Sequence, residues 1–413
     1  MSDYSQAIAS MGAVPRSRPG AAEVPSLVAL LLPNFGAVVF AVALLQVLFL
    51  SQGAQALFRD SDTGWHVRNG ETILETAAAP RVDNFSYTRE GRPWFAWEWL
   101  SDALLGGAYR IGGLTGVALL AAVAIALTVW GAARLSLSLG GNLFFTAAAM
   151  VLLLGVTSIH WLARPHVFSW LLSLLFLSIA EHERRKPNRF LYALPLLACL
   201  WANLHGSFLL GPAILFIYAI GSFPSLKRRG GCADQWGDRP LSNQEGRRRR
   251  CTEMDGPVGP TSRKGADGVV ILEDSSGPTT PALRATHPFQ GEESFRFAAT
   301  CLVSLLATFI NPYGWRLHEH VLTYLQNDYL MDRIAEFRSF SFHAPGALYV
   351  ELFLFAAVLG TVAMLRQRAF GQALLALGLL HMSLYSARHL PTAAVLLLPL
   401  CVGALTQIGR AHV

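Results

Sequence analysis

The sequence predicts an all-α, polytopic membrane protein with about ten transmembrane helices. Of its 413 residues, 53% are hydrophobic and only 15% are charged, and the mean hydropathy is +0.38. A soluble domain of this length would carry about a quarter charged residues. The apolar residues are also gathered in blocks close to the roughly 17 to 25 residues that a membrane-crossing helix needs. Composition and block length together exclude an ordinary soluble domain.

Ten apolar segments are predicted to span the membrane. They run approximately over residues 30–57, 113–135, 142–159, 165–182, 190–206, 208–224, 296–312, 346–365, 370–387 and 390–407. Lys and Arg are concentrated between alternate segments, with clusters at 184–186 and 227–229. Positive charge marks cytoplasmic loops, so the N-terminus is predicted inside and the first long loop, 58–112, outside.

These segments divide the chain into an N-terminal transmembrane module, 1–225, a cytoplasmic loop, 226–295, and a C-terminal transmembrane module, 296–413. The loop holds four consecutive arginines from Arg247 and many Gly, Pro and Ser residues. Such a segment buries too little apolar surface to offset its ordering entropy, so it is expected to be disordered, and a solvated linker near anionic lipid is favoured over a regulatory domain. The last six residues resemble a translated sequencing adapter, so we expect the natural chain to continue beyond Gln407.

Charge and cysteine content exclude two further classes. The formal net charge of +6 comes largely from arginine clusters between the apolar segments, so it reports topology and predicts no nucleic-acid partner. The five cysteines include no CxxC pair, and three of them lie within apolar segments. Neither a disulfide framework nor a thiolate metal site is predicted.

The predicted outer loop 58–112 has an amphipathic character. Apolar residues between 65 and 74 are spaced to line one side of a short helix, and the stretch 94–100 is dense in the aromatic residues that favour a membrane–water interface. The loop acids Asp83 and Glu98 either face a polar head group or keep an interfacial anchor soluble. We therefore expect amphipathic helices that lie along the outer membrane surface.

Asp60 and Asp62 directly follow the first apolar segment and are the leading catalytic candidates. Acidic residues against a bilayer cost free energy and are usually kept for a function. Two such carboxylates can act as a general base towards an acceptor hydroxyl. They can alternatively hold a divalent cation, Mg²⁺ or Mn²⁺, that neutralises a phosphate. In an extended loop alternate side chains point to opposite faces, so one acid would do the chemistry while its neighbour holds the loop.

Arg164 and Arg388 are the candidate phosphate-binding residues, with His389 beside the second. A guanidinium keeps its charge in a poorly hydrated setting and binds phosphate through two hydrogen bonds. Both arginines fall at the predicted outer ends of apolar segments. The alternative is that they reach towards lipid head groups and carry no further role.

A substrate pocket is predicted from polar and aromatic residues on the same outer side: Trp65, His66, His160, His205 and Glu336. The histidines that lie close together in the sequence lack the i, i+4 spacing of a helical metal pair. Histidines satisfied at the interface are therefore favoured over metal ligands. One-sided placement of acids, arginines and histidines predicts that they share a single pocket outside the membrane.

The chain resembles the GT-C superfamily of integral-membrane glycosyltransferases, which includes protein O-mannosyltransferases, oligosaccharyltransferases and lipid A aminoarabinose transferases. The resemblance is carried by the many spans, the Asp60-Ser-Asp62 motif in the first outer loop and the amphipathic helices of that loop. The segments 201–206, 311–315 and 386–389 look like those of bacterial membrane proteins of this kind. The resemblance implies a sugar donor linked to a polyprenyl phosphate or diphosphate, with Asp60 or Asp62 matching the first-loop acid that acts as base or metal ligand.

The expected function is therefore transfer of a sugar from a polyprenyl-phosphate-linked donor to a hydroxyl of a glycan, lipid or protein acceptor. Asp62 is the expected base and Asp60 its partner or metal ligand. The reaction is expected at the outer face of the cytoplasmic membrane. One rival is a lipid or solute transporter or flippase, which would carry its charged residues near the bilayer midplane. A second rival is a non-catalytic protein that holds cell-envelope enzymes together.

Overall fold

The computed structural model describes residues 34–50, 52–187, 189–223 and 291–411. Within these residues 77% of the chain is helical and no strand forms, which confirms the all-α prediction. The extended pairing in this part of the chain is an isolated bridge between Val82 and Pro93. The predicted loop 226–295 lies mostly outside the described residues. Its last residues are an exception, because a helix begins at Glu292 and replaces the expected loop there.

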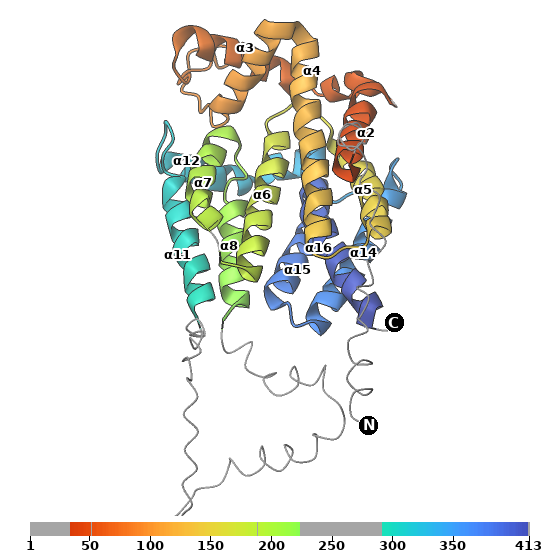
Figure 1. Cartoon of the computed structure of the whole chain (residues 1–413). Helices are drawn as coiled ribbons and strands as arrows, with labels where there is room; N and C mark the ends of the chain where they lie inside the picture. The colour runs from red at the N-terminus through yellow and green to blue at the C-terminus, as the bar shows by residue number, and fades with distance from the viewer. Residues whose placement is uncertain (1–33, 51, 188, 224–290, 412–413) are drawn as a thin grey trace, which may run out of the picture.

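The long and intermediate helices form a bundle (Figure 1). Their bounds are α2 Phe35–Phe49, α4 Trp99–Ser138, α5 Leu143–Thr157, α6 His166–Arg185, α7 Leu194–Leu204, α8 Leu210–Gly221, α11 Glu292–Ala307, α14 Ala347–Arg366, α15 Phe370–Tyr385 and α16 Leu390–Ala411. Three short helices, α3 Asp62–Thr76, α12 Arg316–Leu325 and α13 Asp328–Arg333, lie near one end of the bundle. Short 3-10 segments lie between the helices: η1 Gly53–Phe58, η2 Ser158–His160, η3 Arg189–Ala193, η6 Ala335–Phe337 and η7 Ala387–His389.

Four of these segments are long and apolar enough to cross a membrane: Trp99–Ser138, Leu143–His160, Ala347–Arg366 and Ala387–Gly409. They support a membrane protein. Each of the ten predicted segments contains a helix, but length and composition support four spans and not ten. Four shorter apolar helices explain most of the difference, and α6, which has 20 residues, is too polar at its charged end. A helix of 11 residues such as α7 covers only about 16 Å, about half of the hydrocarbon thickness.

The core of the bundle surrounds α16. Residues 393–404 of this helix are almost all buried, because the chain packs around it from several sides. It lies against α14, where a side chain at Gly360 would collide with Cys401. The opposite face of α14 exposes Phe355 and Leu359, at 69% and 60%. A helix that is apolar on every side suits a lipid environment, since its outer face does not need water.

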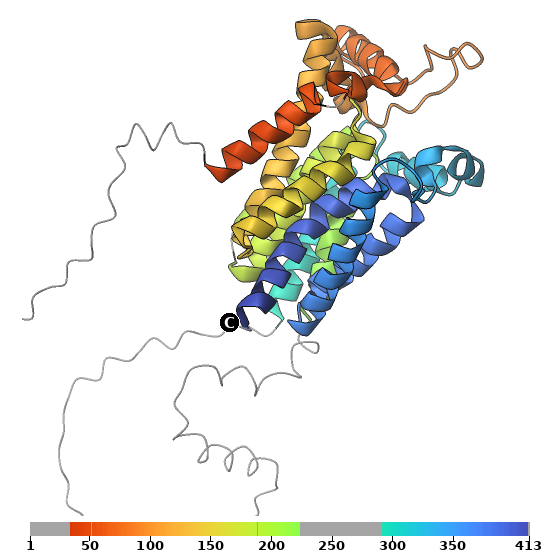
Figure 2. The ribbon, with the colours of Figure 1, turned by 90° about the vertical axis from the view of Figure 1, so that its right-hand side faces the viewer.

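One end of the bundle carries an additional layer, formed by α3 and the first part of α4 (Figures 1 and 2). We call it the α3 end. Helix α4 is broken at Gly112 and Gly113, and Gly113 has a φ of +59°, which favours glycine. The part before the break packs closely on α3, where Cβ atoms at Gly70 or Gly106 would clash with the facing backbone. The predicted loop 58–112 is therefore largely helical.

Candidate functional site

Seven stretches of the chain supply the polar residues at the α3 end. They are the turn before α3, α3 itself, the start of α4, the connection between α5 and α6, the turn after α7, the segment that leads into α14 and the segment that leads into α16. The backbone N–H of Ala163 donates to the carbonyl of Leu57 over 2.9 Å and ties two of these stretches together. Tyr313 ties another, because its hydroxyl accepts from the backbone N–H of Ala96 and donates to the carbonyl of Pro80.

Arg164 holds Asp60 and Asp62 together. Its two Nη atoms each lie 2.8 Å from a carboxylate oxygen, one of Asp60 and one of Asp62. The other oxygen of Asp60 accepts the backbone N–H of Asp62 over 2.8 Å. The expectation that the two acids point to opposite faces is therefore wrong. Helix α3 begins at Asp62, so the chain bends there and both carboxylates reach one guanidinium.

Glu336 lies between the two arginines of the predicted phosphate site. Its Oε1 is 3.0 Å from Nη1 of Arg388, and its Oε2 is 3.9 Å from Nη1 of Arg164 and 3.3 Å from Nε2 of His160. The Glu336 segment is fixed to the start of α16, because the Ser386 hydroxyl donates to the Glu336 carbonyl over 2.9 Å. Three carboxylates at this end thus share two guanidiniums; we call Asp60, Asp62, Glu336, Arg164 and Arg388 the arginine cluster.

A chain of acids and imidazoles adjoins the arginine cluster. Asp102 accepts hydrogen bonds from the Asn69 amide at 2.5 Å and pairs with Nδ1 of His66 at 2.6 Å. Nε2 of His66 is 3.9 Å from one Glu98 oxygen, and Nε2 of His205 is 3.4 Å from the other. All five side chains are buried. We call Asp102, His66, Glu98 and His205 the histidine relay.

Burial raises the pKa of Glu98 to about 7, and the neighbouring Asp102 adds to the shift. His66, Arg388 and Arg164 oppose it, which shows that the arginine cluster lies within electrostatic reach of Glu98. Burial also holds the pKa of His205 well below its usual value, so its ring is neutral. A carboxyl group with a pKa near 7 is suited to exchange protons at physiological pH.

Hydrogen bonding sets the tautomer of His205. The backbone N–H of Ser207 donates to Nδ1 over 3.2 Å, and the hydroxyls of Ser169 and Ser207 lie within 2.9 Å of the same atom. A nitrogen that accepts a backbone N–H carries no proton. The proton of neutral His205 is therefore on Nε2 and points at Glu98.

The remaining predicted site residues have different outcomes. The ring of Trp65 lies against His66, with 3.8 Å between centroids, and lines a cavity described below. His389 does not join Arg388 at the predicted phosphate site. Its Nδ1 donates to the carbonyl of Met382 over 3.2 Å, because η7 turns the imidazole back towards the end of α15.

Asp102 and Asn69 belong to the site but were not predicted from the sequence. Asp102 lies four residues after Glu98, which places both acids on one face if a helix begins near residue 98. That spacing is the signal in the sequence. It was missed because the helix was expected to begin at residue 113, after the break in α4.

The described acids do not favour a dedicated metal site. Among the residues that the structure describes, no group of three or more His, Cys, Asp or Glu side chains is placed to hold a metal ion. Asp60 and Asp62 each direct an oxygen at Arg164, so a cation between them would have to displace the guanidinium. The donor set fits an arginine better than Mg²⁺ or Mn²⁺.

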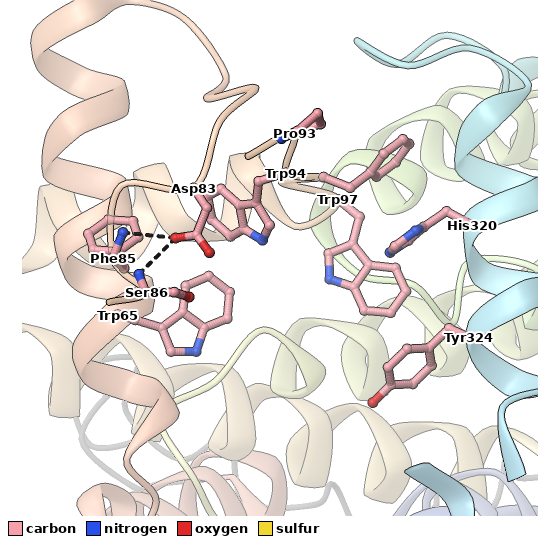
Figure 3. Close-up of a pocket in the computed structure, with 10 residues that line it drawn as sticks. Trp65, Asp83, Phe85, Ser86, Pro93, Trp94, Trp97, His320 and Tyr324 are labelled. Carbon is pink, nitrogen blue, oxygen red and sulfur yellow. Dashed lines mark hydrogen bonds between the residues drawn. The ribbon is translucent and has the colours of Figure 1, made fainter. Parts of the chain in front are cut away.

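A cavity of about 710 Å³ opens at the α3 end (Figure 3). Trp65 and Trp97, which line it, directly neighbour His66 and Glu98 of the histidine relay in the chain. Its walls are mainly aromatic and come from α3, the loop before α4, and α12: Trp65, Trp94, Phe95, Trp97, His320 and Tyr324. Asp83 and Ser86 add polar groups at one side. Phe95 stacks on His320 with 4.5 Å between ring centroids, and Trp97 meets Tyr324 edge to face at 5.2 Å. These contacts join the first loop to α12.

Comparison with family models, with curated proteins and with solved structures gives no match for this chain. The fold and site define a helical protein with four candidate membrane spans and a buried polar centre at one end. Function is therefore inferred from the geometry of that centre.

Proposed function

We propose that the protein is a membrane glycosyltransferase that moves a sugar from a polyprenyl-phosphate-linked donor to an acceptor hydroxyl. The observation that carries this proposal is the arginine cluster. Two guanidiniums that share one carboxylate, Glu336, lie next to an acid, Asp62, that keeps a free oxygen. Such a centre combines a site for a phosphate leaving group with a base for the attacking hydroxyl.

Arg164 and Arg388 form the donor-phosphate site in this proposal. A phosphate, like a carboxylate, accepts paired hydrogen bonds from guanidinium groups. Glu336 contacts both arginines, so an anion of similar size fits between them once the Glu336 carboxylate moves aside. The two positive charges would then stabilise the phosphate as the sugar leaves.

Asp62 is the proposed base. Its Oδ2 binds Arg164, whereas its Oδ1 has no hydrogen-bond partner among the described residues, and the side chain is 39% exposed. Asp60 uses both oxygens within the protein and therefore positions Arg164 and the start of α3. In the reaction Asp62 takes the proton of the acceptor hydroxyl, and that oxygen forms the new bond to the anomeric carbon. The bond from this carbon to the phosphate oxygen breaks, and its electron pair stays on the phosphate.

We assign no step of the proposed sugar transfer to a divalent cation. Each role that the expected cation would fill is met by a residue of the arginine cluster, since Arg164 and Arg388 supply the positive charge. Addition of a chelator is expected to leave the transfer rate unchanged. A rate that falls on chelation and returns with Mg²⁺ or Mn²⁺ would assign the two aspartates to a metal instead.

We further propose that all ten apolar helices cross the cytoplasmic membrane, with the α3 end outside. Basic clusters on the opposite side, such as 184–186, support this orientation through the positive-inside rule. The short helices would cross where the bundle locally thins the bilayer. The orientation is tested by labelling Asp62→Cys and Arg366→Cys with a membrane-impermeant reagent. Only the cysteine at 62 is expected to react in intact cells.

The main experiment is a profile of lipid-linked sugars in a deletion strain. Loss of the transferase is expected to make one polyprenyl-phosphate sugar accumulate, and the wild-type gene is expected to remove it. The Asp62→Asn variant should fail to do so. Glu90→Gln, which neutralises an exposed acid of the same loop, is the matched control and should restore the profile. Full restoration by Asp62→Asn would refute the assigned base.

A further inference from the structure

We propose that the aromatic cavity beside α3 binds a saccharide, which serves as the acceptor of the transferred sugar. The cavity is the 710 Å³ space lined by Trp65, Trp94, Trp97 and Tyr324. That a saccharide binds here is inferred from the cavity alone, whereas its role as acceptor rests on the proposed function. Three features of the cavity support the binding of a saccharide: its ring surfaces, its unused hydrogen-bonding groups and its position.

The ring surfaces suit the apolar faces of a sugar. Aromatic rings carry negative charge on their faces, and the axial C–H bonds of a pyranose carry a small positive charge. Trp65 and Trp94 meet edge to face with 5.7 Å between centroids, so they present surfaces in two directions. A ligand with two different faces, one apolar and one hydroxylated, matches walls of this kind better than a uniform lipid chain.

The unused hydrogen-bonding groups distinguish this cavity from a lipid-binding groove. Elsewhere the indole N–H groups of Trp99, Trp161 and Trp201 donate to protein oxygens at 2.8 to 3.1 Å. The indole N–H groups of Trp94 and Trp97 have no acceptor among the described residues, so both can donate to a ligand in the cavity.

Figure 3 shows these two indole nitrogens pointing towards the space between the rings. The Tyr324 hydroxyl likewise has no partner among the residues that the structure describes. Donors without partners beside apolar faces call for a ligand rich in hydroxyl oxygens. Oδ1 of Asp83, at the same wall, accepts the backbone N–H groups of Phe85 and Ser86, so its Oδ2 is the oxygen proposed to accept a hydroxyl hydrogen of the ligand.

The position of the cavity joins it to the proposed reaction centre. Trp65 lies three residues after Asp62 on α3, which puts the two side chains on neighbouring positions of one helix face. Trp97 directly precedes Glu98 of the histidine relay. A saccharide stacked on Trp65 would therefore present a hydroxyl towards Asp62.

Direct binding tests the inference without any donor. The full chain is placed in lipid nanodiscs, because the head groups of maltoside detergents would compete, and is applied to an array of defined glucose-, mannose-, galactose- and N-acetylhexosamine-containing oligosaccharides. Binding of at least one class is expected. Its dissociation constant is then measured by thermophoresis, with dodecanoate, an alkyl chain with a carboxylate head group, as the lipid-like competitor.

Variants locate the binding site. Trp94→Ala is expected to weaken binding at least tenfold, and Asp83→Asn about threefold. Tyr87→Ala removes an aromatic ring from the same loop that is 99% exposed and does not line the cavity, so it should leave binding unchanged. A melting temperature equal to that of the wild type in each variant shows that the fold is kept. Trp94→Phe keeps a stacking surface without the N–H, so its affinity for the saccharide should lie between those of Trp94→Ala and the wild type.

Three results would overturn the inference. These are no saccharide bound on the array, binding that Trp94→Ala and Asp83→Asn leave unchanged, or displacement of the saccharide by dodecanoate at equal concentration. Failure of the proposed function has a different signature: saccharide binding sensitive to Trp94 with no transfer from any lipid-linked donor. Sugar transfer whose acceptor KM is the same in wild type and Trp94→Ala would retain the function and reject the cavity.

Discussion

Two charged clusters lie at the two ends of α6, and they differ in how far their carboxylates are exposed to solvent. At the far end, Glu181 binds Arg184 at 2.9 Å and Gln372 at 2.6 Å, and Glu183 binds Arg296 at 2.9 Å. Glu181 and Glu183, with their side chains 0% and 2% exposed, each meet their own guanidinium there. At the α3 end three partly exposed carboxylates share two guanidiniums, and a cavity lined by Trp65 and Trp97 opens at the same end of the bundle.

We infer from this difference that the far cluster is structural and that the arginine cluster is the one available for the proposed reaction. Buried ion pairs gain little net stability, but breaking one leaves a charge uncompensated and is costly. The Glu181 cluster also accepts the hydroxyl of Tyr218, so its oxygens are used. The arginine cluster leaves an oxygen of Asp62 free and is partly open to solvent. Polar groups that the fold does not consume are the ones available to a substrate.

The largest expected effect is the loss of activity when Arg164 is changed. Arg164→Lys keeps the positive charge but cannot bind Asp60 and Asp62 with two separate nitrogens in one plane. We expect the transfer rate to fall by about 10³-fold, equivalent to about 4 kcal/mol. Rates are measured in nanodiscs with the donor that the deletion strain identifies. Arg184→Lys is the matched control at the far end and should transfer at the wild-type rate; equal losses in both variants would erase the distinction between the clusters.

The second prediction concerns stability at the far end. Glu181→Ala leaves Arg184, Gln372 and Tyr218 without their shared carboxylate. We expect the free energy of unfolding to fall by about 3 kcal/mol, the cost of a buried charge without its partner. Unfolding is followed by titration with sodium dodecyl sulfate, and activity per folded molecule should stay unchanged. A variant that is fully stable but inactive would show that the far cluster also takes part in function.

The sequence predicted the members of the arginine cluster better than those of the histidine relay, for a physical reason. Asp60, Arg164, Glu336 and Arg388 each follow or precede an apolar segment, and the ends of antiparallel helices on one side of a bundle must gather. Their gathering at one end of the bundle could be predicted from the chain, although their exact pairing could not.

Asp102 depends on tertiary packing that no local pattern reveals. It reaches His66 only because α4 begins before the Gly112–Gly113 break and lies flush on α3 at Gly70. The hydrogen bond from Nδ1 of His389 to the Met382 carbonyl likewise depends on the 3-10 turn, which the sequence did not indicate. The helix ends within the apolar blocks could not be read from the sequence either, and only four of the segments among the described residues have the length and composition of a span.

A third prediction uses pH to probe the histidine relay. Burial raises the pKa of Glu98 from 4.5 to about 7, so the folded protein binds a proton that the unfolded chain releases between these values. Stability from this group is fully present below about pH 4.5 and is lost as the pH rises to about 7, by up to about 3 kcal/mol. Glu98→Gln cannot titrate. As the pH rises from 4.5 to 7, the unfolding free energy of the wild type should therefore fall relative to that of Glu98→Gln. A difference independent of pH would show that Glu98 is ionised throughout this range.

The smallest expected effect is the most informative about the arginine cluster. If a donor phosphate takes the place of the Glu336 carboxylate, Glu336→Gln removes the competing negative charge and keeps the shape of the side chain. The variant should bind farnesyl phosphate about five- to tenfold more tightly than the wild type, a gain of about 1 kcal/mol. Farnesol, which lacks the phosphate, should bind both proteins equally, and Glu90→Gln should leave the affinity unchanged. Weaker binding of farnesyl phosphate by Glu336→Gln would mean that Glu336 holds Arg388 in place for the ligand. The α3 end would then be a paired structural cluster like that around Glu181, and the proposed phosphate site would be lost.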